Sequence, residues 1–352
     1  MCGMPPAIVS VSRRTDVPAF HAQWWMQRVR QGRVLVRNPR NISHVMDVSL
    51  RPDDVTAVVY WSRDYGRLLP MLPELDDRGL RGCFHLTLTG YGHPLELWGP
   101  DVAVVCDQFE ALAHRYGPSR TVWRYDPIVM GTHHDEVYHL QRFAFLARRI
   151  APLVRHCVVS FLDPYPSTRR GLHAIEASGL ERFGSPTIEQ RRRLAAALVA
   201  LGDGVNMPVL ACCETDLADV VSQARCIDPS WISSFVPMDS RGARGLPTRK
   251  GCGCVHARDI GAYQVCGHGC VYCYANDTPQ NGLRNARAVD PNAEHLGVGP
   301  LVCPPRDTAL RQPVSRSKQL EWTSASERAR VRVGNQQLSV NKAAMSMQPV
   351  PR

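Results

Sequence analysis

The feature that most constrains the fold of this chain is a repeated alternation of short apolar runs with longer amphipathic stretches. Six runs rich in β-branched and aromatic residues begin at Ala7, Thr56, Cys83, Thr121, His156 and Met207. The stretches between them, such as CDQFEALAHRYG and TIEQRRRLAAALVALG, carry apolar residues near a 3.6-residue period, as amphipathic helices do. Strands that alternate with helices predict a parallel sheet, so we expect an α/β fold with six β/α units.

Six such units favour a TIM-barrel-like partial barrel, in which functional polar residues gather at the carboxyl ends of the strands. Polar residues stand at or near these ends after the first run, inside the fourth and after the sixth: Arg13, Arg14, Asp16, Arg124, Asp126 and Glu214. We predict that this rim binds a cofactor or substrate, since a guanidinium matches carboxylate and phosphate groups. Helix caps and buried ion pairs are the alternative for each residue. An open doubly wound sheet competes as an architecture, but the first run is not followed by the glycine-rich phosphate-binding loop.

The composition changes near residue 295. We divide the chain into a barrel-like domain at 1–240, a cysteine-rich region at 241–294 that packs on it, and a basic tail at 295–352. The tail is rich in Pro, Ser, Gln and Arg without sustained periodicity, so we predict that it is disordered. From Pro305 onward, nine Lys and Arg against three Asp and Glu supply +6 of the formal net charge of +10. The remaining +4 gives weak support for a nucleic acid partner.

The cysteine content bears on the compartment and on metal binding. No apolar run is long enough to span a bilayer, and the first residues, MCGMPPAIVSVSRR, lack the pattern of a secretory signal. We therefore expect a cytoplasmic protein without a membrane partner. The chain has 13 cysteines. Because the cytosol keeps thiols reduced, they favour metal or cluster ligation over a disulfide framework.

Three of these cysteines lie close together in the stretch CGHGCVYCYAN. Cys266, Cys270 and Cys273 form the pattern C-x3-C-x2-C. Three thiolates on one loop can hold one face of an iron–sulfur cubane and leave the fourth iron open to another ligand. Zinc is the alternative, with His268 as a fourth ligand, but this ring would have to fold back onto the same ion.

The spacing, with Tyr272 directly before the last cysteine, resembles the cluster loop of the radical S-adenosylmethionine (SAM) superfamily. The resemblance implies a [4Fe-4S] cluster on the three thiolates, reductive cleavage of SAM to a 5′-deoxyadenosyl radical, and a low-potential electron donor such as flavodoxin or ferredoxin. It also implies a full or partial β/α barrel and an aromatic residue near the adenine of SAM, so Tyr272 and Asn276 are candidate cofactor-binding residues. The superfamily places this loop after its first strand. Here the loop follows the sixth, which implies a circularly permuted core.

A wider resemblance covers Ala7 to about Asn276. The segments SVSRRTDVPAF, VLVRNP, LTLTGYG, WRYDPIV and GCGCVHARDIGAYQVCGHGCVYCYAN are together similar to an uncharacterised bacterial family, domain of unknown function 1848, which implies no established substrate. The segment CVYCYAN is also similar to spore photoproduct lyase. We predict a radical SAM enzyme whose substrate the sequence does not identify. The alternatives are a DNA-repair lyase and a non-catalytic binding module stabilised by zinc or a cluster.

Four further cysteines are candidate metal ligands. Cys252 and Cys254 form C-x-C ahead of the triplet, Cys213 ends the sixth run, and Cys226 opens the segment CIDP. Together they form a candidate second metal centre, either another [4Fe-4S] cluster or a structural zinc, with buried thiols and no metal as the alternative. Cys212 competes with Cys213, because adjacent residues of a strand face opposite ways, and we favour Cys213.

Overall fold

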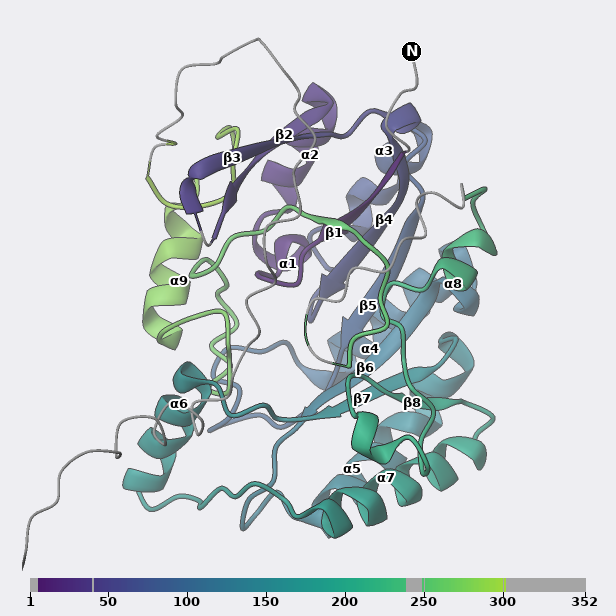
Figure 1. Cartoon of the computed structure of the whole chain (residues 1–352), viewed down its shortest axis with the longest axis vertical. Helices are drawn as coiled ribbons and strands as arrows, with labels where there is room; N and C mark the ends of the chain where they lie inside the picture. The colour runs from purple at the N-terminus through teal and green to yellow at the C-terminus, as the bar shows by residue number, and fades with distance from the viewer. Residues whose placement is uncertain (1–5, 40, 239–248, 250, 300, 302–352) are drawn as a thin grey trace, which may run out of the picture. The chain divides into compact units, whose positions relative to one another are not determined.

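The computed structural model describes residues 6–39, 41–238, 249, 251–299 and 301, which lie within one compact unit, Met1–Pro304. At its centre is a seven-stranded sheet in the order β8-β7-β6-β5-β4-β1-β9, and each neighbouring pair is parallel (Figure 1). The strands are β1 (Ala7–Val11), β4 (Val55–Ser62), β5 (Gly82–Thr87), β6 (Thr121–Ile128), β7 (Cys157–Phe161), β8 (Val209–Ala211) and β9 (Arg258–Asp259).

The predicted α/β fold with six β/α strands is confirmed. Strands β1 and β4 to β8 coincide with the six apolar runs within a few residues. Their spatial order follows their order in the sequence and lacks the reversal of a doubly wound sheet, so the competing architecture was wrong. Strand β9 was not predicted, because its two residues, Arg258 and Asp259, carry no apolar signal. They pair with Val9 and Ser10 of β1.

The helices begin and end where the sequence provides caps. Helix α2 (Ala22–Gln31) is followed by Gly32, whose φ of 70° lies in the left-handed region that glycine tolerates. Helix α7 begins with a capping box between Thr187 and Gln190. The α-helices are α1 (Val17–Phe20), α2 (Ala22–Gln31), α3 (Leu72–Asp77), α4 (Val102–Tyr116), α5 (Glu136–Ile150), α6 (Pro166–Ala177), α7 (Ile188–Asp203), α8 (Pro229–Ser233) and α9 (Pro279–Ala288). No helix in the described ranges is long and apolar enough to cross a membrane.

Strands β2 (Arg33–Asn38) and β3 (Asn41–Ser49) pair antiparallel outside the main sheet and were also not predicted. The β2 strand meets the C-terminal part of the described chain, since the Leu35 amide donates to the Glu294 carbonyl at 2.9 Å. His295 and Leu296 are buried there. The packed chain therefore continues past the predicted tail boundary at residue 295, and the predicted tail from 302 onward lies outside the described residues.

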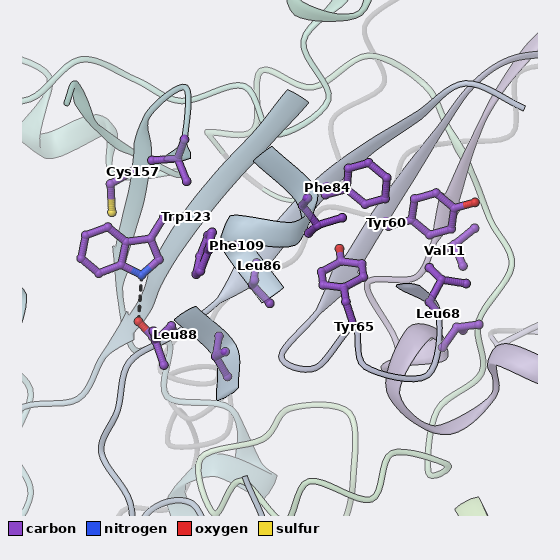
Figure 2. Packing of buried hydrophobic residues seen from close by; sticks show 14 of the residues in the cluster. Val11, Tyr60, Tyr65, Leu68, Phe84, Leu86, Leu88, Phe109, Trp123 and Cys157 are labelled. Carbon is purple, nitrogen blue, oxygen red and sulfur yellow. Dashed lines mark hydrogen bonds between the residues drawn. The ribbon is translucent and has the colours of Figure 1, made fainter. Parts of the chain in front are cut away.

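One face of the sheet packs against helices. Side chains from β1, β4, β5, β6 and β7 form a continuous core with Phe109 of α4, and Figure 2 shows part of it. Tyr60 and Phe84 stack with their ring centroids 5.3 Å apart. The indole of Trp123 donates to the Leu88 carbonyl at 2.9 Å, which satisfies its only polar group inside the core (Figure 2).

The opposite face of the sheet is covered by irregular chain rather than by a layer of long helices. Ala57, Val122 and Val158 on this face belong to a second buried cluster with Trp231 and Ile232 of α8. Both faces of the sheet are thus buried, as parallel sheets require. Five cysteines belong to this cluster or pack against it from the chain between β8 and β9: Cys212, Cys213, Cys226, Cys252 and Cys254.

Candidate functional site

The cysteine triplet lies on the loop that follows β9. Because β9 is parallel to β1, the two strands end at the same edge of the sheet, where the loops of such folds carry function. The side chains of Cys266, Cys270 and Cys273 are partly exposed. Their thiols also lie within electrostatic range of one another. Burial, followed by the charges of Glu96 and Cys273, raises the pKa of Cys270 to about 12. The structure therefore gathers the three predicted sulfur donors on one loop at the functional edge.

His268, between the first two cysteines, contacts the carboxylate of Asp16. Its Nε2 lies 2.7 Å from Asp16 Oδ2, and the ring is buried. Asp16 Oδ1 also accepts from the Ala19 amide at 3.0 Å, which caps α1, and from Ser62 Oγ at 2.7 Å. Both oxygens of Asp16 have protein partners. The cap alternative describes this residue better than the predicted contact with a cofactor.

Tyr272 also turns inward, with 6% of its surface exposed. Its hydroxyl donates to Glu96, and Arg63 donates to the same hydroxyl at 3.0 Å. Arg63 Nη2 lies 2.6 Å from Glu96 Oε1. Burial alone would raise the pKa of Glu96, but Arg63 and the hydrogen bonds from Thr89 and Tyr272 hold this pKa below its usual range. Tyr272 therefore anchors the loop to a buried ion pair. Its ring is buried and does not face a ligand, in contrast to the predicted contact with a cofactor.

Close backbone contacts hold the rest of the loop. The Asn276 side-chain amide donates to the Cys266 carbonyl at 2.8 Å, so this predicted cofactor residue also supports the loop. A Cβ on Gly282 of α9 would lie 2.2 Å from Asn276 Nδ2 and 2.5 Å from the Cys266 oxygen. A Cβ on Gly171 of α6 would lie 2.1 Å from the Val271 oxygen. Only glycine lets the two helices approach the loop this closely.

The arginines after β1 pair with Asp259 of β9. Arg14 Nε lies 3.0 Å from Asp259 Oδ1, and Arg13 Nε lies 3.6 Å from Oδ2. The carboxylate also accepts from Ser10 and Ser12 at 2.8 and 2.7 Å. Although burial opposes ionisation, these arginines hold the pKa of Asp259 below its ordinary value. The ion-pair alternative therefore describes Arg14, whereas 24% of the Arg13 side chain remains exposed.

The other predicted rim residues also have partners in the protein. Arg124 Nε donates to Asp126 Oδ2 at 3.0 Å, and its Nη1 donates to Cys226 Sγ at 3.1 Å. Glu214 accepts from the Phe161 amide at 2.7 Å and pairs with Arg191 of α7. Glu214 thus joins β7 to α7, which is a structural role.

The predicted second group of cysteines comes together and includes one more member. Cys212 Sγ lies 3.7 Å from Cys213 Sγ and 3.4 Å from Cys226 Sγ. The expectation that only one of the adjacent pair faces the group was wrong, because both residues follow the end of β8 and Cys213 has a φ of 64°. The described cysteines form no disulfide bond. In the described part of the chain, no three His, Cys, Asp or Glu side chains surround a ready-made position for a metal ion.

Sequence comparison assigns the family. The profile of a family described as "Domain of unknown function (DUF1848)" matches residues 8–275, most of the chain. This chain belongs to the DUF1848 family. The match runs from β1 through the triplet loop, so the sheet and both cysteine groups of this DUF1848 protein lie inside the family boundaries. No curated protein matches the sequence.

Solved structures resemble this DUF1848 protein only distantly. A D-hydantoinase structure matches at 13% identity and a TM-score of 0.29, covering 70% of this chain and 52% of that one. Dihydropyrimidinase from Brevibacillus agri matches at 11% identity and a TM-score of 0.28, covering 73% and 53%. The chain spans about half the length of these enzymes. Likeness at this level carries no argument about function.

Three residues that organise the site of this DUF1848 protein were missed from the sequence: Arg63, Glu96 and Asp259. Arg63 follows the apolar run at Thr56 directly, so its place after a strand was a usable signal. Glu96 and Asp259 lie in segments without such a pattern. Their roles depend on partners 33 and 245 or more residues away in the chain, which periodicity does not reveal.

Proposed function

We propose that this protein binds a [4Fe-4S] cluster through Cys266, Cys270 and Cys273 and uses it for reductive cleavage of SAM. The observation that carries the proposal is the orientation of the triplet loop. The three cysteines are partly exposed at the functional edge of the sheet, while His268 and Tyr272 between them turn inward. When bound, such a cluster supplies the electron that SAM cleavage requires.

The donor set fits a cubane with one open iron better than a structural zinc. A closed zinc site takes four ligands, whereas the loop supplies three thiolates, and His268, whose Nε2 contacts Asp16, could add a fourth only through its buried Nδ1. Three thiolates from one loop leave one metal position open, which is where a radical SAM enzyme takes its cosubstrate. This reasoning supports an enzyme over a zinc-stabilised binding module.

The position of β9 supports a circularly permuted core as part of the proposal. In the spatial order β9-β1-β4-β5-β6-β7-β8, the strand before the triplet is last in the sequence but first in the sheet. In this proposal, a loop supplied from the C-terminal side takes the place that the radical SAM superfamily gives to the loop after its first strand.

Two residues beside the loop are candidates to contact SAM. Tyr274 is 53% exposed, and its hydroxyl donates to the Arg13 carbonyl. Arg13 carries the more exposed guanidinium of the pair that meets Asp259. An exposed aromatic ring offers a surface for adenine, and a guanidinium matches a carboxylate. In this proposal Tyr274 takes the role that the sequence assigned to Tyr272, and Arg13 keeps its predicted role.

The chemistry also requires partners. Reduction of the cluster calls for a low-potential electron donor of the flavodoxin or ferredoxin class, and thiolate ligation suits the reducing cytoplasm. We propose such an electron donor and a cytoplasmic location. The described residues do not identify the substrate.

The experiment uses the full chain, purified and reconstituted with iron and sulfide without oxygen. It is reduced with dithionite, mixed with SAM and assayed for 5′-deoxyadenosine. We expect product from the native protein and from Cys106→Ala, a buried cysteine of α4, and none from Cys270→Ala. A fully loaded cluster that yields no product, with or without added cell extract as a source of substrate, would overturn the enzymatic proposal.

A further inference from the structure

Five thiols outside the triplet form a closed ring of contacts. Cys213, Cys212 and Cys226 contact one another in that order at 3.7 and 3.4 Å. Cys226 also lies beside Cys254, Cys254 beside Cys252, and Cys252 beside Cys213, each pair close enough for one thiol to shift the pKa of the other. The proposed function uses none of these thiols. Free cysteines are usually buried as small hydrophobic groups, so five thiols that each lie beside two others call for another explanation.

We propose that this ring is a second metal site, in which a single tetrahedral ion of the zinc class is bound by four thiolates. Cys226, Cys252 and Cys254 supply three of them. Cys212 or Cys213 supplies the fourth, because these neighbours occupy adjacent positions in the ring and zinc takes four ligands.

The spacing of the sulfurs favours a single ion over a cluster. Four sulfurs at about 2.3 Å from a tetrahedral ion stand about 3.8 Å from one another. The separation between two candidate ligands, Cys212 Sγ and Cys226 Sγ, is 3.4 Å and is close to this value. A [4Fe-4S] cubane would hold its thiolates much farther apart, because the cluster itself fills the space between them. Since the sulfurs now touch one another, small side-chain rotations would open a position for the ion.

Groups around the ring suit thiolates. Arg124 Nη1 donates to Cys226 Sγ at 3.1 Å, and the Ile227 amide donates to Cys254 Sγ at 3.4 Å. Arg249 Nη2 lies 3.8 Å from Cys212 Sγ. Hydrogen bonds of this kind orient ligands and stabilise their charged form, and two guanidinium groups offset part of the negative charge of four thiolates.

The position of the ring indicates what the metal would do. Cys212 and Cys213 follow β8, the edge strand of the sheet, while Cys252 and Cys254 precede β9 at the other end of the strand order. Cys226 comes from the irregular chain that covers the face of the sheet opposite α4. One ion would therefore join the two ends of the open sheet through its covering segment. Binding free energy of such a site adds directly to folding stability.

The test measures metals in the full chain, purified without oxygen and not reconstituted. Zinc and iron are determined by mass spectrometry, with acid-labile sulfide measured alongside. X-ray absorption at the zinc edge reports the ligands of the native protein directly. We expect about one zinc per chain with four sulfur neighbours at about 2.3 Å.

Two double variants test the assignment of ligands. Cys226→Ala with Cys254→Ala should lower zinc at least about tenfold, whereas Cys106→Ala with Cys157→Ala, which removes two buried thiols elsewhere, should leave it unchanged. The triple replacement of Cys266, Cys270 and Cys273 by alanine separates this site from the proposed cluster. Zinc should persist in that variant even if the cluster proposal fails.

Several outcomes would overturn the inference. Native protein without zinc does so, as does zinc with nitrogen or oxygen neighbours. Iron and sulfide that persist in the triple variant and disappear with Cys226 and Cys254 would make the ring a second cluster. If the Cys226 and Cys254 double variant does not fold, the absorption spectrum of the native protein decides.

Discussion

His268 Nε2 lies 2.7 Å from Asp16 Oδ2, so the imidazole between Cys266 and Cys270 is held by a carboxylate of the segment that follows β1. The ring of Phe20 packs edge-on against it with centroids 4.7 Å apart. The Asp16 carboxylate also caps α1, so His268 connects the triplet loop to the segment that follows β1. The histidine therefore positions the loop through Nε2, and we predict that it is not a fourth metal ligand.

Replacement of His268 by asparagine should leave the metal content of the triplet unchanged. The lost contact should lower the free energy of unfolding by about 1–3 kcal/mol, because Asp16 loses a buried partner. Urea denaturation measures the stability, and iron and sulfide per chain after reconstitution measure the cluster. Cys270→Ala is the control that should lose iron. If His268→Asn loses iron to the same extent, the histidine is a ligand.

The buried pair of Arg63 and Glu96 should be far more sensitive to replacement than an exposed pair. Arg63→Met leaves the Glu96 carboxylate buried without its cation, which should cost about 3–5 kcal/mol of unfolding free energy. Arg30→Met is the matched control, since its partner Glu74 lies on the surface, and it should cost less than about 1 kcal/mol. Chemical denaturation compares the two. Similar losses would show that Arg63 does not hold a buried charge.

The parallel sheet was predictable because its interior strands are buried on both faces and read as apolar runs. The run at Thr56 shows this, since most residues of β4 are buried. Strand β9 could not be found in this way. Arg258 and Asp259 extend the sheet by two residues, and Asp259 is held by serines and arginines from the distant β1 segment.

The candidate site was only partly predictable for a related reason. The spacing of Cys266, Cys270 and Cys273 places them on one loop whatever the fold. The facing direction of Tyr272 depends on Arg63 and Glu96, which reach it only through the tertiary structure. The alternation rule misassigned Cys212 because β8 ends before it, and a local backbone turn is not visible as periodicity.

Gly282 should resist a substitution that ordinarily stabilises helices. Alanine is preferred to glycine inside a helix by about 1 kcal/mol. Here the added Cβ would lie 2.5 Å from the Cys266 oxygen, so Gly282→Ala should lower the melting temperature and reduce cluster loading together. Gly184→Ala is the control, since a Cβ there meets nothing within 4 Å. Thermal unfolding and iron content provide the measurements, and a Gly282 variant as stable as the native protein would contradict the close contact.

The buried His139 should make stability depend on pH. Its Nε2 donates to the Val129 carbonyl at 3.0 Å, and its Nδ1 accepts from the Tyr125 hydroxyl at 2.9 Å. The neutral ring makes both contacts without placing a charge in the core. Burial accordingly lowers the pKa of His139 from 6.5 to about 4. Between these two pKa values, His139 is therefore protonated in the unfolded chain and neutral in the folded chain.

Stability from His139 is present above pH 6.5 and should be lost as the pH falls toward 4, by about 3 kcal/mol in all. His139→Gln keeps a donor and an acceptor but does not titrate, so it should flatten the pH dependence of the unfolding free energy in this window. Urea titrations at closely spaced pH values measure the slope. His156, whose pKa burial also lowers to about 4, leaves a remaining slope in the variant. Identical slopes in both proteins would mean that the pKa of His139 is the same in the folded and the unfolded chain.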